Sequence, residues 1–285
     1  MTPTPPRTET VVDETRKALE ETQLRERMRA IRRRLLILSG KGGVGKSTVA
    51  VNLAVALAQA GETVGLLDVD VHGPSVPRLT GLDGRTVSLD GSTILPAPFM
   101  DRLTVMSIGF FLKRPSDAVI WRGPLKFQMI RQFLKDVAWG RLDSLVVDCP
   151  PGTGDEPLSV VQLAGSPAVA VVVTTPQEVS IADVRRCVTF CNSLSVPVLG
   201  IVENMSGLVC PSCGAEIDLF KRGGGEDLAR ETGVPFLGRI PIDPAIVSSG
   251  DDGTPFVRDR ASTPAASAFL ELAARIREPA ADRTR

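Results

Sequence analysis

The sequence lacks several features that large classes of protein require. Its 285 residues include no tyrosine, one histidine and no excess of charge, since 33 basic side chains balance 33 acidic ones. A net charge of zero argues against nucleic acid or an anionic membrane as a partner held by bulk electrostatics. The longest apolar run, near residues 168–173, has the length of a strand, whereas a membrane span needs about eighteen residues. We therefore expect no nucleic-acid partner and no membrane partner.

Cysteine is also scarce, and its use indicates the compartment. The five cysteines form an odd set, and the first residues, MTPTPPRTETVVDETRK, contain no apolar signal region. This combination predicts a cytoplasmic protein whose thiols stay free or bind metal. A hydrophobic content of 43% with 23% charged residues is ordinary for a globular domain.

What the sequence does contain is a phosphate-binding loop. Residues 40–48 read GKGGVGKST and follow an apolar strand expected at 35–39. In the pattern G-x-x-x-x-G-K-[ST], the glycines let backbone N–H groups reach phosphate oxygens, Lys46 reaches the β- and γ-phosphates, and the Ser47 hydroxyl suits Mg²⁺. The residues expected to bind the nucleotide here are Gly40, Lys41, Gly42, Gly43, Val44, Gly45, Lys46, Ser47 and Thr48.

The loop holds a second lysine, Lys41, in a chain with seven lysines and 26 arginines. KGGVGKST resembles the deviant P-loop of the ATPases related to the nitrogenase iron protein, MinD, ParA and the arsenite pump ATPase. That resemblance implies that the early lysine reaches the nucleotide of a partner subunit. A cation supplied in this way stabilises the transferring phosphoryl group only when two subunits close together. The alternative is that Lys41 is a solvated loop lysine.

Two later strands end in carboxylates, at the sheet edge where open α/β proteins bind ligands. A strand at 63–68 precedes Asp70, and a strand at 144–148 ends at Asp148 in a Walker B arrangement. We expect Asp70 to position the attacking water and Asp148 to bind Mg²⁺, with Asp68 supporting the metal shell. The candidate catalytic residues are Lys41, Lys46 and Asp70, and the candidate magnesium residues are Ser47, Asp68 and Asp148.

The base of the nucleotide is assigned mainly by resemblance to the same class of ATPases. Asn204 follows a strand expected at 198–203 and places an amide where a purine edge is read. Pro241 and Asp243 belong to a segment that would close over the base. These three residues complete the predicted nucleotide site.

A cysteine pair separates this chain from other P-loop proteins. Cys210 and Cys213 stand at C-x-x-C spacing in CPSCG, and the chain has no second such pair. Two thiolates are too few for tetrahedral zinc or a cubane cluster. If metal is bound, the missing ligands must come from a second subunit across a two-fold axis. A bridging [4Fe–4S] cluster, a bridging zinc and a redox dithiol are the three alternatives.

Several motifs in order resemble the Mrp-type iron–sulfur cluster carriers, a branch of the deviant-P-loop ATPases. They are SGKGGVGKST at 39–48, DVDVHGPS at 68–75, SIGFF at 107–111, WRGP at 121–124, DCPPGTGD at 148–155, ENMSGLVCPSCG at 203–214 and GGGEDLA at 223–229. The resemblance implies a homodimer that binds ATP and Mg²⁺, hydrolyses ATP slowly and carries a labile [4Fe–4S] cluster to apo iron–sulfur proteins. Cys210 and Cys213 match the cluster ligands. A ParA- or MinD-like positioning ATPase with a zinc-bridged dimer is the alternative function.

The pattern of strands and helices predicts an α/β fold, a single P-loop NTPase domain with a mostly parallel sheet flanked by helices. We expect a tail and charged helix over 1–30, the ATPase domain over 31–279 and a C-terminal tail over 280–285. The charged helix itself is expected at 13–34, packed by Leu19, Met28 and Ile31, after a disordered segment at 1–10. Other expected helices lie at 46–60, 124–137, 178–194, 223–232 and 264–277, further strands at 103–107 and 168–174, and a β-hairpin at 86–95.

Overall fold

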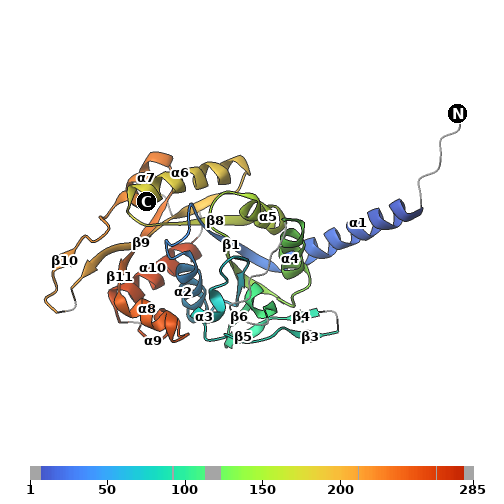
Figure 1. The fold of residues 1–285 in the computed structure, drawn as a ribbon, viewed down its shortest axis with the longest axis horizontal. Coiled ribbons are helices and arrows are strands. Elements are labelled where there is room, and N and C mark those ends of the chain that lie inside the picture. The colour runs from blue at the N-terminus through green and yellow to red at the C-terminus, as the bar shows by residue number, and fades with distance from the viewer. Residues whose placement is uncertain (1–7, 92, 113–122, 211, 261, 279–285) are drawn as a thin grey trace.

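The fold is described from a computed structural model, which covers residues 8–91, 93–112, 123–210, 212–260 and 262–278. Its main feature is a nine-stranded sheet that runs through the molecule (Figure 1). In sheet order the strands are β10 (Glu216–Ile217), β9 (Val198–Val209), β8 (Ala168–Thr174), β1 (Ile31–Ser39), β7 (Leu142–Asp148), β2 (Val64–Asp68), β6 (Leu103–Ser107) and β5 (Ala97–Met100), and β11 (Phe236–Ile242) pairs with β9. All neighbours are parallel except β10 with β9 and β5 with β6.

Helices cover both faces of the sheet. On one face lie α2 (Lys46–Gln59), α3 (Val76–Leu79), α8 (Pro244–Asp251), α9 (Phe256–Asp259) and α10 (Pro264–Arg277). On the other lie α4 (Gly123–Lys135), α5 (Asp155–Ala164), α6 (Glu178–Ser193) and α7 (Gly224–Thr232), and α1 (Thr8–Arg29) packs against α4. Because both faces are covered, the central strands are apolar runs rather than alternating ones, and LLIL, LVV and AVVV are buried. The α/β prediction is confirmed.

Among the described residues, no helix is long and apolar enough to cross a membrane. The last helix, α10, buries Phe269, Leu272, Ala273 and Ile276 against α2 and β11. Its apolar stripe is therefore part of the core, as helical spacing of those residues indicates. A two-stranded hairpin, β3 (Ser88–Asp90) with β4 (Thr93–Leu95), and a 3₁₀ turn, η1 (Ile108–Phe111), complete the elements.

The prediction for the first helix was wrong at both ends. The helix begins at Thr8 and ends at Arg29, and Ile31 starts β1 instead of continuing the helix. Leu19 does not pack against the core, because it is 57% exposed. Residues 8–10 of the segment expected to be disordered at 1–10 belong to this helix, whereas residues 1–7, the expected tail at 280–285 and the first half of the WRGP motif lie outside the described residues.

Arginines in the first half of β1 explain why residues 31–34 were assigned to the helix, whereas the strand predicted at 35–39 is confirmed. Arg33 makes an ion pair of 2.7 Å with Glu62, and its Nη1 donates to the carbonyl of Ile276 at 2.7 Å. These partners lie 29 and 243 residues away along the chain. A run of arginines has no strand signal of its own, so contacts that are distant in sequence decide its structure.

The sheet register places the ends of three strands side by side. Asp68, the last residue of β2, is directly opposite Asp148, the last residue of β7. Asp148 also pairs with Ile37 of β1, two residues before β1 ends and the P-loop begins. The fold therefore delivers both carboxylates and the glycine-rich loop to one edge of the sheet, where α/β proteins bind ligands.

Candidate functional site

The P-loop turns tightly between β1 and α2. Gly45 caps α2 with φ 80°, a left-handed conformation that favours glycine. A side chain there would also collide with the Asn204 amide. Gly40 passes so close to the backbone of Asp183 in α6 that a Cβ atom would clash with it. Both glycines are therefore required by space, and the loop's N–H groups stay at the positive end of α2.

Lys46 lies at the centre of a group of buried charges. Its ammonium contacts the Asp148 carboxylate at 2.5 Å and the Asp70 carboxylate at 3.9 Å. Burial lowers the pKa of Lys46, but the charges of Asp148 and Asp70 outweigh it, so that the pKa is raised overall. The lysine is therefore positively charged and held beside both carboxylates.

Asp68 is a fully buried carboxylate of the site. Its oxygens accept hydrogen bonds from the Asp70 backbone N–H at 3.0 Å, the Ser107 hydroxyl at 2.9 Å and the Val76 N–H at 3.3 Å. Burial, followed by the neighbouring charge of Asp148, raises the pKa of Asp68 to about 8. These donors belong to the loop after β2, to the start of α3 and to the end of β6, so Asp68 connects these three segments.

Asp148 has the chemistry of a magnesium ligand. The side chain is fully buried, and its Oδ2 atom has no hydrogen-bond partner among the described residues. The hydroxyl of Ser47 lies 3.4 Å from the Lys46 ammonium that Asp148 contacts. A hard, oxygen-seeking cation such as Mg²⁺ fits this set of donors, because an orphaned carboxylate oxygen is costly without one. Ser47 and Asp148 are the residues that would hold it.

The side chain of Asp70 is partly buried, with 13% of its surface exposed. Its pKa is raised by burial and by Asp148, against the lowering effect of Lys46. The carboxylate accepts the backbone N–H of His72 at 3.2 Å, which fixes the start of the following loop. A carboxylate beside the phosphate-binding lysine, with a raised pKa, suits the orientation of water.

A cluster beside this loop was not found from the sequence. His72 Nε2 lies 3.0 Å from Glu156 Oε1 and 2.8 Å from Lys126 Nζ, and Lys126 also contacts Glu156. The three residues come from the loop after β2, from α4 and from α5. Burial raises the pKa of Glu156, but hydrogen bonds from Lys126 and His72 lower it more. No spacing in the sequence signals a contact between residues 54 and 84 positions apart.

Strand β9 connects the P-loop to the cysteine pair. It runs to Val209, six residues beyond the predicted end of the strand, and passes through Asn204. The Asn204 amide nitrogen donates to the carbonyl of Val44 in the P-loop at 2.9 Å. Asn204 therefore lies beside the P-loop and its amide nitrogen is bonded to the loop, while its expected contact with the base stays a prediction.

Of the residues expected over the base, Pro241 lies on the neighbouring strand β11 and Asp243 directly follows that strand. Ile240 of β11 pairs with Asn204 of β9, so Pro241, in β11, follows directly. Asp243 caps α8, its Oδ1 accepting from the Ala245 N–H at 2.9 Å. The fold thus brings Asn204, Pro241 and Asp243 into the same region, while giving Asp243 a structural task as well.

Glu203 is a second buried carboxylate that the sequence analysis did not assign. It accepts the N–H groups of Gly223 at 3.0 Å and Gly225 at 2.5 Å, and the Ser206 hydroxyl at 2.5 Å. Arg239 of β11 lies 3.5 Å away. The carboxylate sits at the positive N-terminus of α7, which accounts for the glycines of the GGGEDLA motif.

The cysteine pair forms the tip of a hairpin at the end of β9. The N–H of Cys210 donates to the carbonyl of Ala215 at 2.9 Å, and the N–H of Gly214 donates back to the carbonyl of Cys210 at 2.9 Å. Cys213 is exposed and Cys210 half-buried, whereas Cys149, Cys187 and Cys191 are buried. Backbone N–H groups of Cys213 and Ser212 lower the pKa of Cys210, which favours the thiolate that binds metal.

The remaining cysteines are core residues. Burial raises the pKa of Cys149 far above its usual range, as expected for a small apolar side chain. Cys187 and Cys191 pack on the inner face of α6. Within the part of the chain that the structure describes, no three histidine, cysteine or acidic side chains meet as a metal site. Among the described cysteines, Cys210 and Cys213 are the two that are not buried.

A P-loop beside a Walker B aspartate, on a mostly parallel sheet, defines a P-loop nucleoside triphosphatase. The model of one family, described as the NUBPL iron-transfer P-loop NTPase within the ParA group, matches residues 30–277. The chain belongs to this family, which confirms the resemblance drawn from its motifs.

Named relatives agree with this assignment. The cytosolic Fe-S cluster assembly factor NUBP2 of Bos taurus is 51% identical over 251 residues, covering 86% of this chain and 92% of the relative. The Homo sapiens protein of the same name is 50% identical over the same length, with the same coverage. The cytoplasmic location expected from the sequence agrees with these names.

Two solved structures have the same fold, one of them in complex with ADP and the other an ATPase. A nucleotide-binding protein from Archaeoglobus fulgidus, in complex with ADP, is 43% identical with a TM-score of 0.73, over 82% of this chain and 91% of that one. The cell division ATPase MinD of Pyrococcus furiosus is 26% identical with a TM-score of 0.61, over 86% of this chain and 98% of that one.

Proposed function

We propose that this chain is an ATP-dependent carrier of iron–sulfur clusters. Two copies bind ATP and hydrolyse it slowly, hold one labile [4Fe–4S] cluster between their cysteine pairs, and transfer it to apo-proteins. The observation that carries the proposal is the position of Cys210 and Cys213. They project on an exposed hairpin that continues the strand in contact with the P-loop.

A cluster shared by two chains follows from the number of ligands. One chain offers Cys210 and Cys213, and a cubane cluster takes four thiolates. A two-fold axis through the cluster supplies the same pair twice. Apolar side chains next to the hairpin support an interface at this place, since Val209 is 46%, Ile217 42% and Leu219 58% exposed. Isolated exposed apolar residues are common, but three that adjoin one hairpin favour a protein partner.

Strand β9 is the physical link between nucleotide and cluster. Asn204 contacts the P-loop, and Cys210 follows six residues later, immediately after the strand ends. The segment between them is irregular, because Met205 and Gly207 have positive φ values of 56° and 75° and the pairing with β11 shifts register there. Movement of the P-loop on nucleotide exchange reaches the hairpin through this short segment of the sheet.

We assign roles to the nucleotide residues from the contacts around Lys46 and Asp148 and, for Lys41, from the resemblance of the loop. The P-loop N–H groups and Lys46 bind the phosphates, and Ser47 and Asp148 hold Mg²⁺, which neutralises charge on the phosphoryl group when bound. Asp70, beside Lys46, orients the attacking water. Lys41, in the same loop, reaches the partner's nucleotide, so hydrolysis depends on the dimer.

The names of the relatives support this function. The Bos taurus and Homo sapiens proteins are named cytosolic Fe-S cluster assembly factors, and the matching family is described as iron-transfer NTPases. The Archaeoglobus fulgidus structure contains ADP, which supports a nucleotide at the P-loop here. Recipient proteins are expected to be apo forms of iron–sulfur proteins.

Anaerobic reconstitution tests the proposal. Purified protein is loaded with iron and sulfide, desalted, and assayed for both elements, for its visible spectrum and for its mass in solution. We expect about four irons and four sulfides per dimer. The variant C210A/C213A should lose them while still binding ADP, and S212A, which changes the same hairpin but no thiol, should retain them.

Other results would overturn the proposal in distinct ways. A cluster retained at full stoichiometry by C210A/C213A would place it elsewhere. One tightly held zinc per dimer without sulfide would make the pair a structural clasp. The chain would then be a dimeric switch ATPase, closer to the positioning role of MinD.

A further inference from the structure

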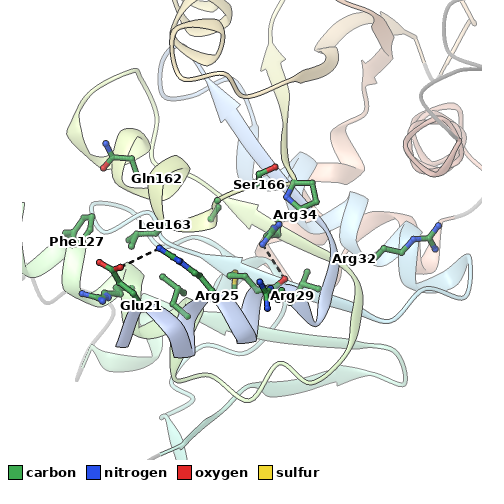
Figure 2. Close-up of a pocket in the computed structure, with 16 residues that line it drawn as sticks. Glu21, Arg25, Arg29, Arg32, Arg34, Phe127, Gln162, Leu163 and Ser166 are labelled. Atoms are coloured by element: carbon green, nitrogen blue, oxygen red, sulfur yellow. Dashed lines mark hydrogen bonds and ion pairs between the residues drawn. The ribbon is translucent and has the colours of Figure 1, made fainter. Parts of the chain in front are cut away.

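An arginine-rich pocket lies at the end of the sheet opposite the P-loop. It has a volume of about 850 Å³ and is bounded by α1, by the start of β1, and by the turn between α5 and β8 (Figure 2). Pockets of this size bind small molecules. The pocket lies beside the N-terminal half of β1, and the P-loop follows the C-terminal end of the same nine-residue strand. A ligand here therefore does not occupy the nucleotide site.

The charge of the lining is strongly unbalanced. Its charged members are five arginines and one glutamate, namely Arg25, Arg29, Arg32, Arg34, Arg131 and Glu21. Arg25 is paired with Glu21 at 3.6 Å, and Arg131 with Glu20 at 3.5 Å. Among the described residues, no carboxylate lies within ion-pair distance of the other three arginines.

Arg34, a buried residue of the lining, has the hydrogen-bonding capacity to bind an anion. The residue is 3% exposed, and its guanidinium donates one hydrogen bond, to the carbonyl of Met28 at 3.3 Å. Its Nε atom is buried without a hydrogen-bond partner, as is the Nε atom of Arg131. Burial lowers the pKa of Arg34. A buried guanidinium with an unsatisfied donor is costly, and an oxyanion at this point would satisfy it.

The uncharged lining includes the polar residues Gln162 and Ser166 and several apolar side chains. Leu24 and Met28 of α1, Phe127 of α4 and Leu163 of α5 stand around the charged groups, and Figure 2 shows Arg25 extending from α1 toward Leu163. The lining therefore matches a ligand with both an anionic group and an apolar body. The whole of α1 precedes residue 30, where the family match begins, so one wall of this pocket lies outside that match.

We propose that this pocket binds a small molecule in which a phosphate or carboxylate group is attached to an apolar body. The anionic group lies at Arg34, with Arg25 and Arg29 at the entrance, and the body packs against Met28 and Phe127. Guanidinium forks pair with either oxyanion through two parallel hydrogen bonds. The site is separate from the nucleotide and cysteine sites, so it stands or falls independently of the cluster-carrier function.

Matched probes test this site and identify the anion. Phenyl phosphate, 3-phenylpropionate and neutral benzyl alcohol are titrated by calorimetry into protein whose P-loop is already saturated with Mg–ADP. We expect one of the two anions to bind with one-to-one stoichiometry and benzyl alcohol not to bind. The anion that binds more tightly identifies the ligand as a phosphate or a carboxylate.

Variants locate the binding. R25A/R29A removes two exposed charges and should lower the affinity for the anion at least about tenfold, since charge-assisted hydrogen bonds are lost. R34K, which keeps the charge and removes the guanidinium fork, should weaken it as well. The control R186A/R230A removes two exposed arginines on α6 and α7 and should leave the affinity within twofold.

Three outcomes would overturn the proposal. They are no binding of either anion to the wild type, equal binding to R25A/R29A and the wild type, and an equal loss in R25A/R29A and R186A/R230A. The last result would show attraction to overall charge and no defined site.

Discussion

The Asn204 amide donates a hydrogen bond of 2.9 Å to the carbonyl oxygen of Val44, so the strand that leads to the cysteine hairpin holds the phosphate-binding loop directly. Both residues are buried. A shift of the loop would act on β9 through this bond, and under the proposed function a cluster that orders the hairpin would act on the loop through the same bond. Coupling between two such sites is reciprocal for binding free energies.

Replacing Asn204 with alanine tests this link. The change removes a buried donor and leaves the Val44 carbonyl unsatisfied, which should lower the free energy of unfolding by about 1–3 kcal/mol. It should also lower the affinity for ADP by about tenfold, because the P-loop loses its hydrogen bond to β9. Urea unfolding and ADP titration measure the two effects. N192A, on the exposed surface of α6, is the control, and equal effects in both variants would contradict the link.

Lys41 should act in hydrolysis rather than in binding. K41A is expected to bind ATP within about twofold of the wild type but to hydrolyse it about a hundredfold more slowly, as when a charge supplied by a second subunit is removed. Wild-type activity per molecule should rise with protein concentration, and that of K41A should not. K135A, a lysine of α4 far from the loop, controls for charge. Unchanged hydrolysis in K41A would make this residue a solvated loop lysine.

Glu203 should matter for stability. In E203Q the side chain keeps its shape but loses the charge that accepts the N–H groups of Gly223 and Gly225 at the start of α7. We expect a loss of about 3 kcal/mol in the free energy of unfolding, measured in urea. E226Q affects the partly exposed partner of the same arginine, Arg239, and should cost less than about 1 kcal/mol. Equal losses in the two variants would refute the capping role.

Glu156 makes a pH-dependent contribution. Its pKa is lowered in the folded protein by Lys126 and His72, against the raising effect of burial. A lowered carboxyl pKa adds stability above the unfolded value near 4.5, and that stability is lost as pH falls through the folded value. E156Q should therefore be less stable than the wild type at pH 7 and equal to it below about pH 3.

Unfolding measured from pH 3 to 8 checks this expectation. E271Q, an exposed glutamate of α10, should match the wild type throughout. A constant difference between E156Q and the wild type over the whole range would mean that the carboxylate's charge is not what stabilises the cluster with His72 and Lys126.

Sequence patterns predicted correctly those features that depend on interactions between neighbouring residues. The apolar runs of β1, β7 and β8, the glycine spacing of the P-loop and the apolar stripe of α10 each follow from a few neighbouring residues. The same holds for the paired cysteines, whose turn needs only four residues. These features predicted the α/β fold and the positions of the nucleotide loop and the cysteine pair.

Local pattern failed where distant partners decide. Arg33 belongs to a strand because Glu62 and the carbonyl of Ile276 are available to it. β9 continues to Val209 because β10 and β11 pair with its second half, and β11 itself was missed as a strand. The cluster of His72, Lys126 and Glu156 and the arginine pocket bring together segments that share no sequence signal.

By itself, the sequence determined that this protein has a glycine-rich phosphate loop with two lysines, a Walker B aspartate and a single C-x-x-C pair, since each depends on residue identity at fixed spacing. Only the tertiary structure decided that Asn204 joins the loop to the strand of the cysteines, that Glu203 caps α7, and that Arg34 is buried without enough partners. Hydrogen bonds and burial depend on which segments the sheet register brings together, and that register is a property of the whole fold.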